Sequence, residues 1–306
     1  MVLCISMLFF LLGCPTEDDP TDSDTDSDAA CVGVDEDQDG VDACTDCDDD
    51  DAGRFPGAVE LCNGIDDNCD DALAWGEDDS DGDQLADCLT CDEQGFWYPE
   101  LEGQDLRDAL HEATKGLSCS DYSTVTTWMF TKLDKADGEV ECVYTGRTTA
   151  VGSTKPSQGD MNTEHTWPQS YGASSSPMKC DVNHLYPTDS DANNRRGSFP
   201  FGEVTSSITW NEGGSMVGND ATGGTVFEPR DVHKGNVARS MLYFWVRYED
   251  RLETSEISTQ LDQDLYTQWD VDDPADEVEI ERSLAIGDYL GSANPFVLCP
   301  GLVDRI

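Results

Sequence analysis

A glutamate–histidine pair in the stretch MNTEHTWPQSYG, residues 161–172, combines a metal ligand with a proton acceptor. The chain has only four histidines. An imidazole with an ordinary pKa of about 6.5 can take up a proton close to neutral pH. On a strand, adjacent side chains point to opposite faces, so Glu164 could bind a metal ion while His165 activates a water molecule. By itself the pair is a weak indication, because a histidine beside an acid is more often structural.

A second polar stretch, CDVNHLYPTDSDANNRRGSFPFG, starts at Cys180. Its residues 181–187 are interpreted as a short strand. Thr188 and, three residues later, Asp191 form a variant of a capping box, which predicts that a short helix starts there. Asn193 and Asn194 would lie on that helix. The predicted order is a strand with the Glu-His pair, a loop, a second strand and a short helix that carries amides.

Helices and strands alternate irregularly after residue 100, which indicates an α+β domain over residues 100–306 with more helices than strands. Apolar residues recur at helical spacing in several segments, and one segment is rich in β-branched residues and alternates in the manner of a strand. The predicted helices lie within 101–117, 121–136, 235–252 and 270–297, and the predicted strand within 139–146.

Three segments of this domain, in order along the chain, resemble the endonuclease I family. They are NTEHTWPQS, CDVNHLYPTDSDANNRRGSFPFGEV and FEPRDVHKGNVARSMLYFWVRY. The resemblance covers roughly residues 105–300. It implies a ββα-metal (His-Me finger) core embedded in a mostly helical domain. It also implies a metal-dependent nuclease that hydrolyses phosphodiester bonds of DNA, RNA or both.

The resemblance assigns roles to individual residues. His165 falls on the general base, Glu164 and Asn193 on the metal ligands, and Arg196 on an arginine that contacts phosphate. Asn194 remains an alternative to Asn193. A carboxylate and an amide leave several water molecules on the metal, which suits Mg²⁺, with Mn²⁺ or Ca²⁺ as alternatives. The implied products carry a 5′-phosphate and a 3′-hydroxyl. Other matching residues are interpreted as mainly structural: Asp181, His184, Glu228, Asp231, Lys234 and Arg239.

The segment before the domain is predicted to export the protein. Residues 1–14, MVLCISMLFFLLGC, are apolar but too short to span a bilayer, and they are typical of a bacterial lipoprotein signal peptide. Cys14 would carry a lipid anchor to the outer membrane, and the protein would reach the cell surface or the medium. No Lys or Arg precedes the apolar run, so either the start codon is misplaced or the signal is weak. Residues 15–30 are predicted to be a disordered acidic tether.

Residues 31–92 are predicted to be a loop-rich, disulfide-containing region that binds calcium. DEDQDG at 35–40 and EDDSDGD at 77–83 alternate carboxylates around a glycine, so that oxygen atoms converge on a hard cation. These segments resemble thrombospondin type 3 calcium repeats and the metal-binding repeats of secreted bacterial proteins; the alternative is a solvated acidic spacer. The predicted Ca²⁺ ligands are Asp35, Asp37, Asp39, Glu77, Asp79, Asp81 and Asp83.

Charge and cysteine content constrain this interpretation. Thirteen cysteines suit an oxidising compartment, and the late cysteines, Cys119, Cys142, Cys180 and Cys299, could form two bridges of undetermined pairing. The net charge of −48 is unusual for a nuclease, because nucleic-acid-binding surfaces are mostly basic. Either divalent cations screen the repulsion or local bases form a positive groove: Lys155, Lys179, Arg195, Arg196, Arg230, Lys234 and Arg239. The alternative function is a calcium-binding surface adhesion protein with a non-catalytic nuclease-like domain.

Overall fold

A two-stranded hairpin followed by a short helix carries the two polar stretches. In the computed structural model, β4 (Met161–His165) pairs antiparallel with β5 (Leu185–Asp189), and α4 (Ser190–Arg196) begins directly after β5. Asp189 caps α4 by accepting a hydrogen bond from the backbone N–H of Ala192. The predicted cap at Thr188 is therefore wrong by one residue, because the Thr188 hydroxyl lies against Sγ of Cys142 at 3.5 Å, whereas the Asp189 carboxylate faces the first turn of α4.

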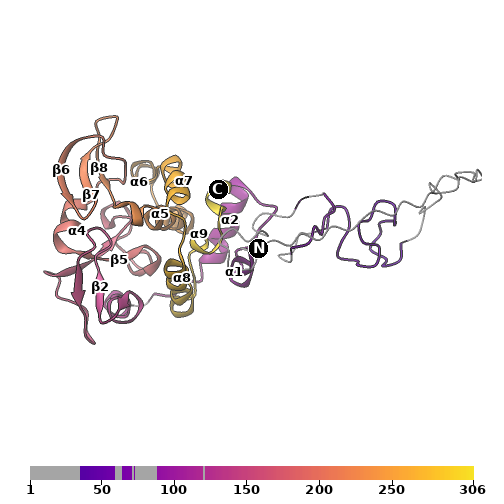
Figure 1. The fold of residues 1–306 in the computed structure, drawn as a ribbon, viewed down its shortest axis with the longest axis horizontal. Coiled ribbons are helices and arrows are strands. Elements are labelled where there is room, and N and C mark those ends of the chain that lie inside the picture. The colour runs from indigo at the N-terminus through magenta and orange to yellow at the C-terminus, as the bar shows by residue number, and fades with distance from the viewer. Residues whose placement is uncertain (1–34, 59–63, 71, 73–87, 120) are drawn as a thin grey trace, which may run out of the picture.

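The structure describes residues 35–58, 64–70, 72, 88–119 and 121–306 (Figure 1). The predicted signal peptide, the tether and the second acidic loop at 77–83 lie outside the described residues. No helix within the described ranges is both long and apolar enough to cross a membrane.

Two small antiparallel sheets accompany the hairpin. The first contains β1 (Lys135–Ala136), β2 (Glu139–Glu141) and β3 (Thr148–Ala150), and the second contains β6 (Ser206–Glu212), β7 (Ser215–Asn219) and β8 (Thr225–Glu228). The strand predicted within 139–146 ends at Glu141, because the chain turns there towards β3 through Gly146, whose φ is +73°. The second predicted strand is also shorter, since residues Val182–His184 form a 3₁₀ turn before β5.

The helices surround α5 (Lys234–Tyr248), whose core residues Val237, Met241 and Phe244 are fully buried. This helix packs against α2, α7 and α9 and lies among them in Figure 1. The mixture of helices and small sheets confirms the predicted α+β class. The other α-helices of the described residues are α1 (Cys88–Glu93), α2 (Gly103–Thr114), α3 (Tyr122–Trp128) with its π-helical continuation (Met129–Leu133), α6 (Thr254–Gln260), α7 (Gln263–Asp272), α8 (Glu277–Leu290) and α9 (Pro295–Leu298).

Disulfides connect distant parts of the chain. Cys119 pairs with Cys180, so one bridge lies within the set of late cysteines. Cys299 instead pairs with Cys91 of α1, 208 residues earlier, and Cys142 is a buried free thiol. A further bridge, Cys47–Cys69, closes a loop of the acidic region.

Candidate active site

Asn193 on α4 lies over the strand that carries the Glu-His pair. Its Nδ2 donates a hydrogen bond of 3.1 Å to the carbonyl oxygen of Thr163 on β4. Because this bond uses the amide nitrogen, the amide oxygen Oδ1 is left available as a ligand. Asn194 is exposed and makes no contact of this kind to any described residue. The geometry therefore favours Asn193 over Asn194 as the helical ligand.

Glu164 is buried on the side of β4 that faces Tyr144. Its Oε1 accepts a hydrogen bond from the Tyr144 hydroxyl at 2.9 Å and lies 3.2 Å from Nε of Arg196. Its Oε2 makes no hydrogen bond to any residue in the described part of the chain. Burial raises the pKa of Glu164, and the positive charge of Arg196 opposes that rise.

His165 is held by a backbone carbonyl and by two rings. Its Nε2 lies 3.1 Å from the carbonyl oxygen of Lys179. The ring of Tyr122 stacks against the imidazole at 5.7 Å between centroids, and His184 meets it edge-on at 5.4 Å. Burial lowers the pKa of His165 to about 4, against the opposing effect of backbone hydrogen bonds to Lys179 and Thr163. The ring is therefore neutral at physiological pH, which a proton acceptor requires.

Arg196 is almost completely enclosed, with 1% of its surface exposed. Besides its contact with Glu164, its guanidinium donates to the carbonyl oxygens of Thr166 at 2.6 Å and Gly197 at 3.1 Å, and it lies over the ring of Phe201. In this arrangement Arg196 orients Glu164. The predicted contact between Arg196 and phosphate stays a prediction.

The other matching residues make internal contacts. Asp181 accepts hydrogen bonds from the hydroxyls of Tyr243 and Tyr248 at 2.8 and 2.9 Å. Nε2 of His184 contacts the carbonyl of Met178. Lys234 and Arg239 each pair with carboxylates, as the following contacts show: Lys234 with Glu228, Asp231 and Glu203, and Arg239 with Glu279 and Asp270.

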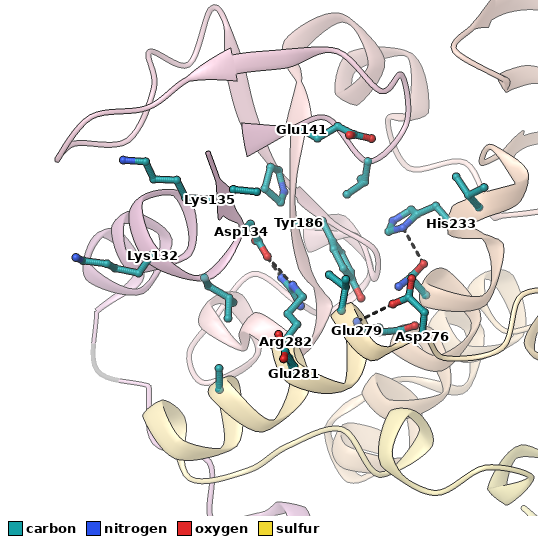
Figure 2. Close-up of a pocket in the computed structure, with 18 of the residues that line it drawn as sticks. Lys132, Asp134, Lys135, Glu141, Tyr186, His233, Asp276, Glu279, Glu281 and Arg282 are labelled. Carbon is teal, nitrogen blue, oxygen red and sulfur yellow. Dashed lines mark hydrogen bonds and ion pairs between the residues drawn. The ribbon is translucent and has the colours of Figure 1, made fainter. Parts of the chain in front are cut away.

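A cavity of about 740 Å³ lies beside the hairpin but is lined by none of the predicted site residues (Figure 2). Tyr186, His233 and Arg282 contribute to its wall. Arg282 is bonded to Asp134 and lies over the ring of Tyr186. Burial lowers the pKa of His233 to about 3. Asp134, Glu141 and Glu279 of its wall are paired with arginines, whereas Lys132 and Lys135 form no ion pair with any described residue.

Sequence patterns did not reveal Tyr144, Tyr122 or the carbonyl of Lys179. Tyr144 lies 20 residues before Glu164, and Lys179 lies 14 residues after His165. A backbone carbonyl carries no side-chain signal, and no spacing relates either tyrosine to the Glu-His pair. Only the packed structure brings these groups to the site.

Carboxylates of the acidic loop at 35–40 lie beside carboxylates of the following acidic run, and the assignment of Asp35, Asp37 and Asp39 as calcium ligands stays a prediction. Ligand oxygens of Asp37, Asp39 and Asp46 lie within 4.8 Å of one another, and so do those of Asp35, Asp37 and Asp49. One oxygen each of Asp37, Asp39 and Asp46 is buried without a hydrogen-bond partner among the described residues. Asp46 and Asp49 were not predicted, because they belong to the uniform acidic run DCDDDD. Glu77, Asp79, Asp81 and Asp83 lie outside the described residues.

Comparison with known proteins agrees with the resemblance. A sequence model described as Endonuclease I matches residues 110–301, which is more than half of the chain. The chain belongs to the endonuclease I family. Two relatives support this assignment. The extracellular ribonuclease of Bacillus amyloliquefaciens is 30% identical over 231 residues, which cover 69% of this chain and 77% of the relative. The extracellular ribonuclease of Bacillus subtilis (strain 168) is 30% identical over 222 residues, covering 67% and 74%.

In this endonuclease I family member, the matched range contains β4, β5, α4 and α5, and hence every predicted active-site residue. A second model, described as "Putative metal-binding motif", matches residues 46–73. That range contains Asp46, Asp49 and the Cys47–Cys69 disulfide. Family membership supports a hydrolytic nuclease, and the second motif supports metal binding in the acidic region.

Proposed function

We propose that the protein is an exported, metal-dependent nuclease that hydrolyses phosphodiester bonds at a ββα-metal site formed by β4, β5 and α4. The observation that supports this best is the placement of three residues on one hairpin and the helix that follows it. Glu164 and His165 are adjacent on β4, and Asn193 of α4 is bonded to the carbonyl of Thr163 on the same strand. A proton acceptor and two oxygen ligands thus share one strand–strand–helix unit.

Glu164 and Asn193 would hold the divalent ion. Oε2 of Glu164 and Oδ1 of Asn193 are the oxygens that their internal hydrogen bonds leave available. One carboxylate and one amide suit Mg²⁺ with several retained waters, and Mn²⁺ or Ca²⁺ fit the same oxygens. Such an ion would neutralise the charge that develops on the phosphate and on the leaving oxygen.

His165 would take the proton from the attacking water. A carbonyl oxygen can only accept a hydrogen bond, so the contact with Lys179 places the proton of the neutral ring on Nε2. Nδ1 then carries the lone pair that acts as the base. Attack by this water opposite the 3′ oxygen gives the expected 5′-phosphate and 3′-hydroxyl ends. Arg196 would keep Glu164 ionised and oriented towards the ion.

The substrate is proposed to be RNA, DNA or both, and the names of the two relatives, both extracellular ribonucleases, favour RNA. Those names also favour export, which agrees with the predicted signal at residues 1–14. A lipid anchor on Cys14 and Ca²⁺ bound by Asp35, Asp37 and Asp39 complete the proposal. The unpartnered carboxylate oxygens of the acidic loop support the calcium sites.

Digestion of plasmid DNA and of RNA, each with Mg²⁺ and with EDTA, tests the activity. We expect cleavage with Mg²⁺ only. His165→Ala should abolish it while the circular dichroism spectrum is unchanged, and His111→Ala is the control, since His111 lies on α2 outside the site. Cleavage by the His165→Ala variant at the wild-type rate would refute the assignment of His165 as the base. No cleavage with Mg²⁺, Mn²⁺ or Ca²⁺ would favour a calcium-binding adhesion protein.

A matched pair of substitutions tests the metal ligand. Asn193→Ala should weaken binding of the activating metal by at least about 10- to 100-fold, the loss that follows removal of groups that only support a metal ligand. Asn194→Ala should leave the metal dependence unchanged, because that side chain is exposed. The measurement is initial rate against Mg²⁺ concentration. The reverse order of effects would assign the role to Asn194.

A further inference from the structure

Most of the bases that the sequence suggested for a positive groove are neutralised within the protein. Each of the following pairs with a carboxylate: Arg195, Arg196, Arg230, Lys234 and Arg239. Lys155 and Lys179 make no such pair with any described residue. They are therefore the members of the suggested groove that form no ion pair in the described part of the chain, although the charge of Lys155 contributes, after the hydrogen bonds from Thr124, to lowering the pKa of Asp121.

Lys179 lies beside the proposed base, His165, through its backbone carbonyl and through the ring of Tyr122. Its carbonyl contacts Nε2 of His165, and its ammonium lies 5.1 Å from the centroid of the Tyr122 ring. The same Tyr122 ring stacks on His165. The Cys119–Cys180 disulfide links the residue after Lys179 to the segment before α3. This arrangement keeps a cation next to the imidazole.

Lys155 contacts the face of α3 that carries Tyr122. Its Nζ donates to Oγ1 of Thr126 at 3.2 Å. Thr126 is four residues after Tyr122, so both side chains occupy one face of the helix. Two lysines thus flank one helix face, and that face adjoins His165. On a chain with a net charge of −48, such local cations are needed to attract a polyanion.

We propose that Lys179 and Lys155 form a phosphate-binding rim beside His165. The rim would bind phosphates of the nucleotides next to the scissile bond, so the preferred substrate is a polynucleotide strand and not a small phosphodiester. The proposal rests on the proposed nuclease function and specifies how its substrate is held. Tyr122 acts as a spacer that keeps the ammonium of Lys179 beside the base.

Salt-dependent binding tests the rim. Fluorescence anisotropy of a labelled single-stranded RNA is measured at fixed Mg²⁺ and varied KCl, with full-length His165→Ala protein so that no cleavage occurs. Lys155→Met and Lys179→Met should each weaken binding several-fold at low salt. Each should also make the slope of log affinity against log salt shallower by about 0.7, the contribution of one phosphate contact on a single strand.

Two controls accompany these variants. Lys132→Met removes an exposed lysine from the helical segment that continues α3. The Lys132 side chain lines the cavity of about 740 Å³ beside the hairpin (Figure 2). The Lys132→Met variant should bind like the parent. Lys179→Arg keeps the charge and should restore the parental slope. With the catalytically intact chain, the loss in Lys155→Met should fall on KM more than on kcat, which a general loss of folding would not produce.

The outcomes separate the two proposals. If the wild-type chain cleaves neither RNA nor DNA, the nuclease function itself fails. If it cleaves, but Lys155→Met and Lys179→Met have the same affinity and salt slope as Lys132→Met, the rim is refuted and the function stands. A weaker affinity with an unchanged salt slope also refutes the rim, because no phosphate contact was lost.

Discussion

Replacing Arg196 by methionine should cost about 3–5 kcal/mol of unfolding free energy, the loss seen when one partner of a buried ion pair is removed. Arg196 and Glu164 are 1% and 2% exposed, and Nε lies 3.2 Å from Oε1. Methionine preserves much of the apolar volume against Phe201 but leaves the carboxylate of Glu164 buried, with only the Tyr144 hydroxyl for compensation. The carbonyls of Thr166 and Gly197 also lose their donor.

The loss of stability in Arg196→Met should depend on the negative charge of the Glu164 carboxylate. In the double variant Glu164→Gln/Arg196→Met, no unpaired charge is buried, so part of the stability should return. We expect a coupling free energy of about 0.5–3 kcal/mol between the two positions, which is the range for residues in direct contact. Urea unfolding followed by circular dichroism in EDTA measures Arg196→Met, Glu164→Gln and the double variant without a contribution from bound metal.

Arg195 provides the matched control on the same helix. It pairs with Asp191 at 3.6 Å, but the two side chains are 52% and 60% exposed. Arg195→Met should therefore change stability by no more than about 0.5 kcal/mol. Additive effects of the Glu164 and Arg196 substitutions, or equal costs at Arg195 and Arg196, would refute the conclusion that burial makes this pair stabilise the site.

Other predictions concern stability and calcium. Burial lowers the pKa of His233 in the folded state to about 3. As the pH falls below about 6.5, the unfolded state therefore binds a proton that the folded state does not, and the free energy of unfolding decreases. His233→Gln should reduce the loss between pH 7 and pH 5 by about 2 kcal/mol; thermal melts with equal pH dependence would contradict this. Cys91→Ser/Cys299→Ser should cost up to about 5 kcal/mol in urea, because the bridge spans 208 residues; a loss under about 1 kcal/mol would count against an entropic role. Ca²⁺ should protect residues 31–92 from protease, and Asp37→Asn should reduce that protection; equal digestion with and without Ca²⁺ would remove the calcium sites.

Local sequence determined much of the framework. The Glu-His pair and the amide-bearing segment predicted a strand–strand–helix order, and the structure forms β4, β5 and α4 in that order. Helical spacing located α2, α5 and α8. These predictions succeed because periodicity and turn chemistry act over a few residues and do not need the rest of the fold. The cap of α4 was misplaced by one residue, since both Thr188 and Asp189 are able to cap a helix.

Contacts between distant segments decided the rest. Tertiary packing placed the Tyr144 hydroxyl on Glu164, the Lys179 carbonyl on His165, and Cys91 beside Cys299. It also determined which cations meet carboxylates inside the protein and which stay available on its surface. A composition or a spacing cannot show this, because the partner of a charge or a hydrogen-bonding group depends on which remote segment folds against it. The chemistry of the candidate site is therefore readable from residue types, whereas its protonation and its substrate-binding charge are set by the three-dimensional arrangement.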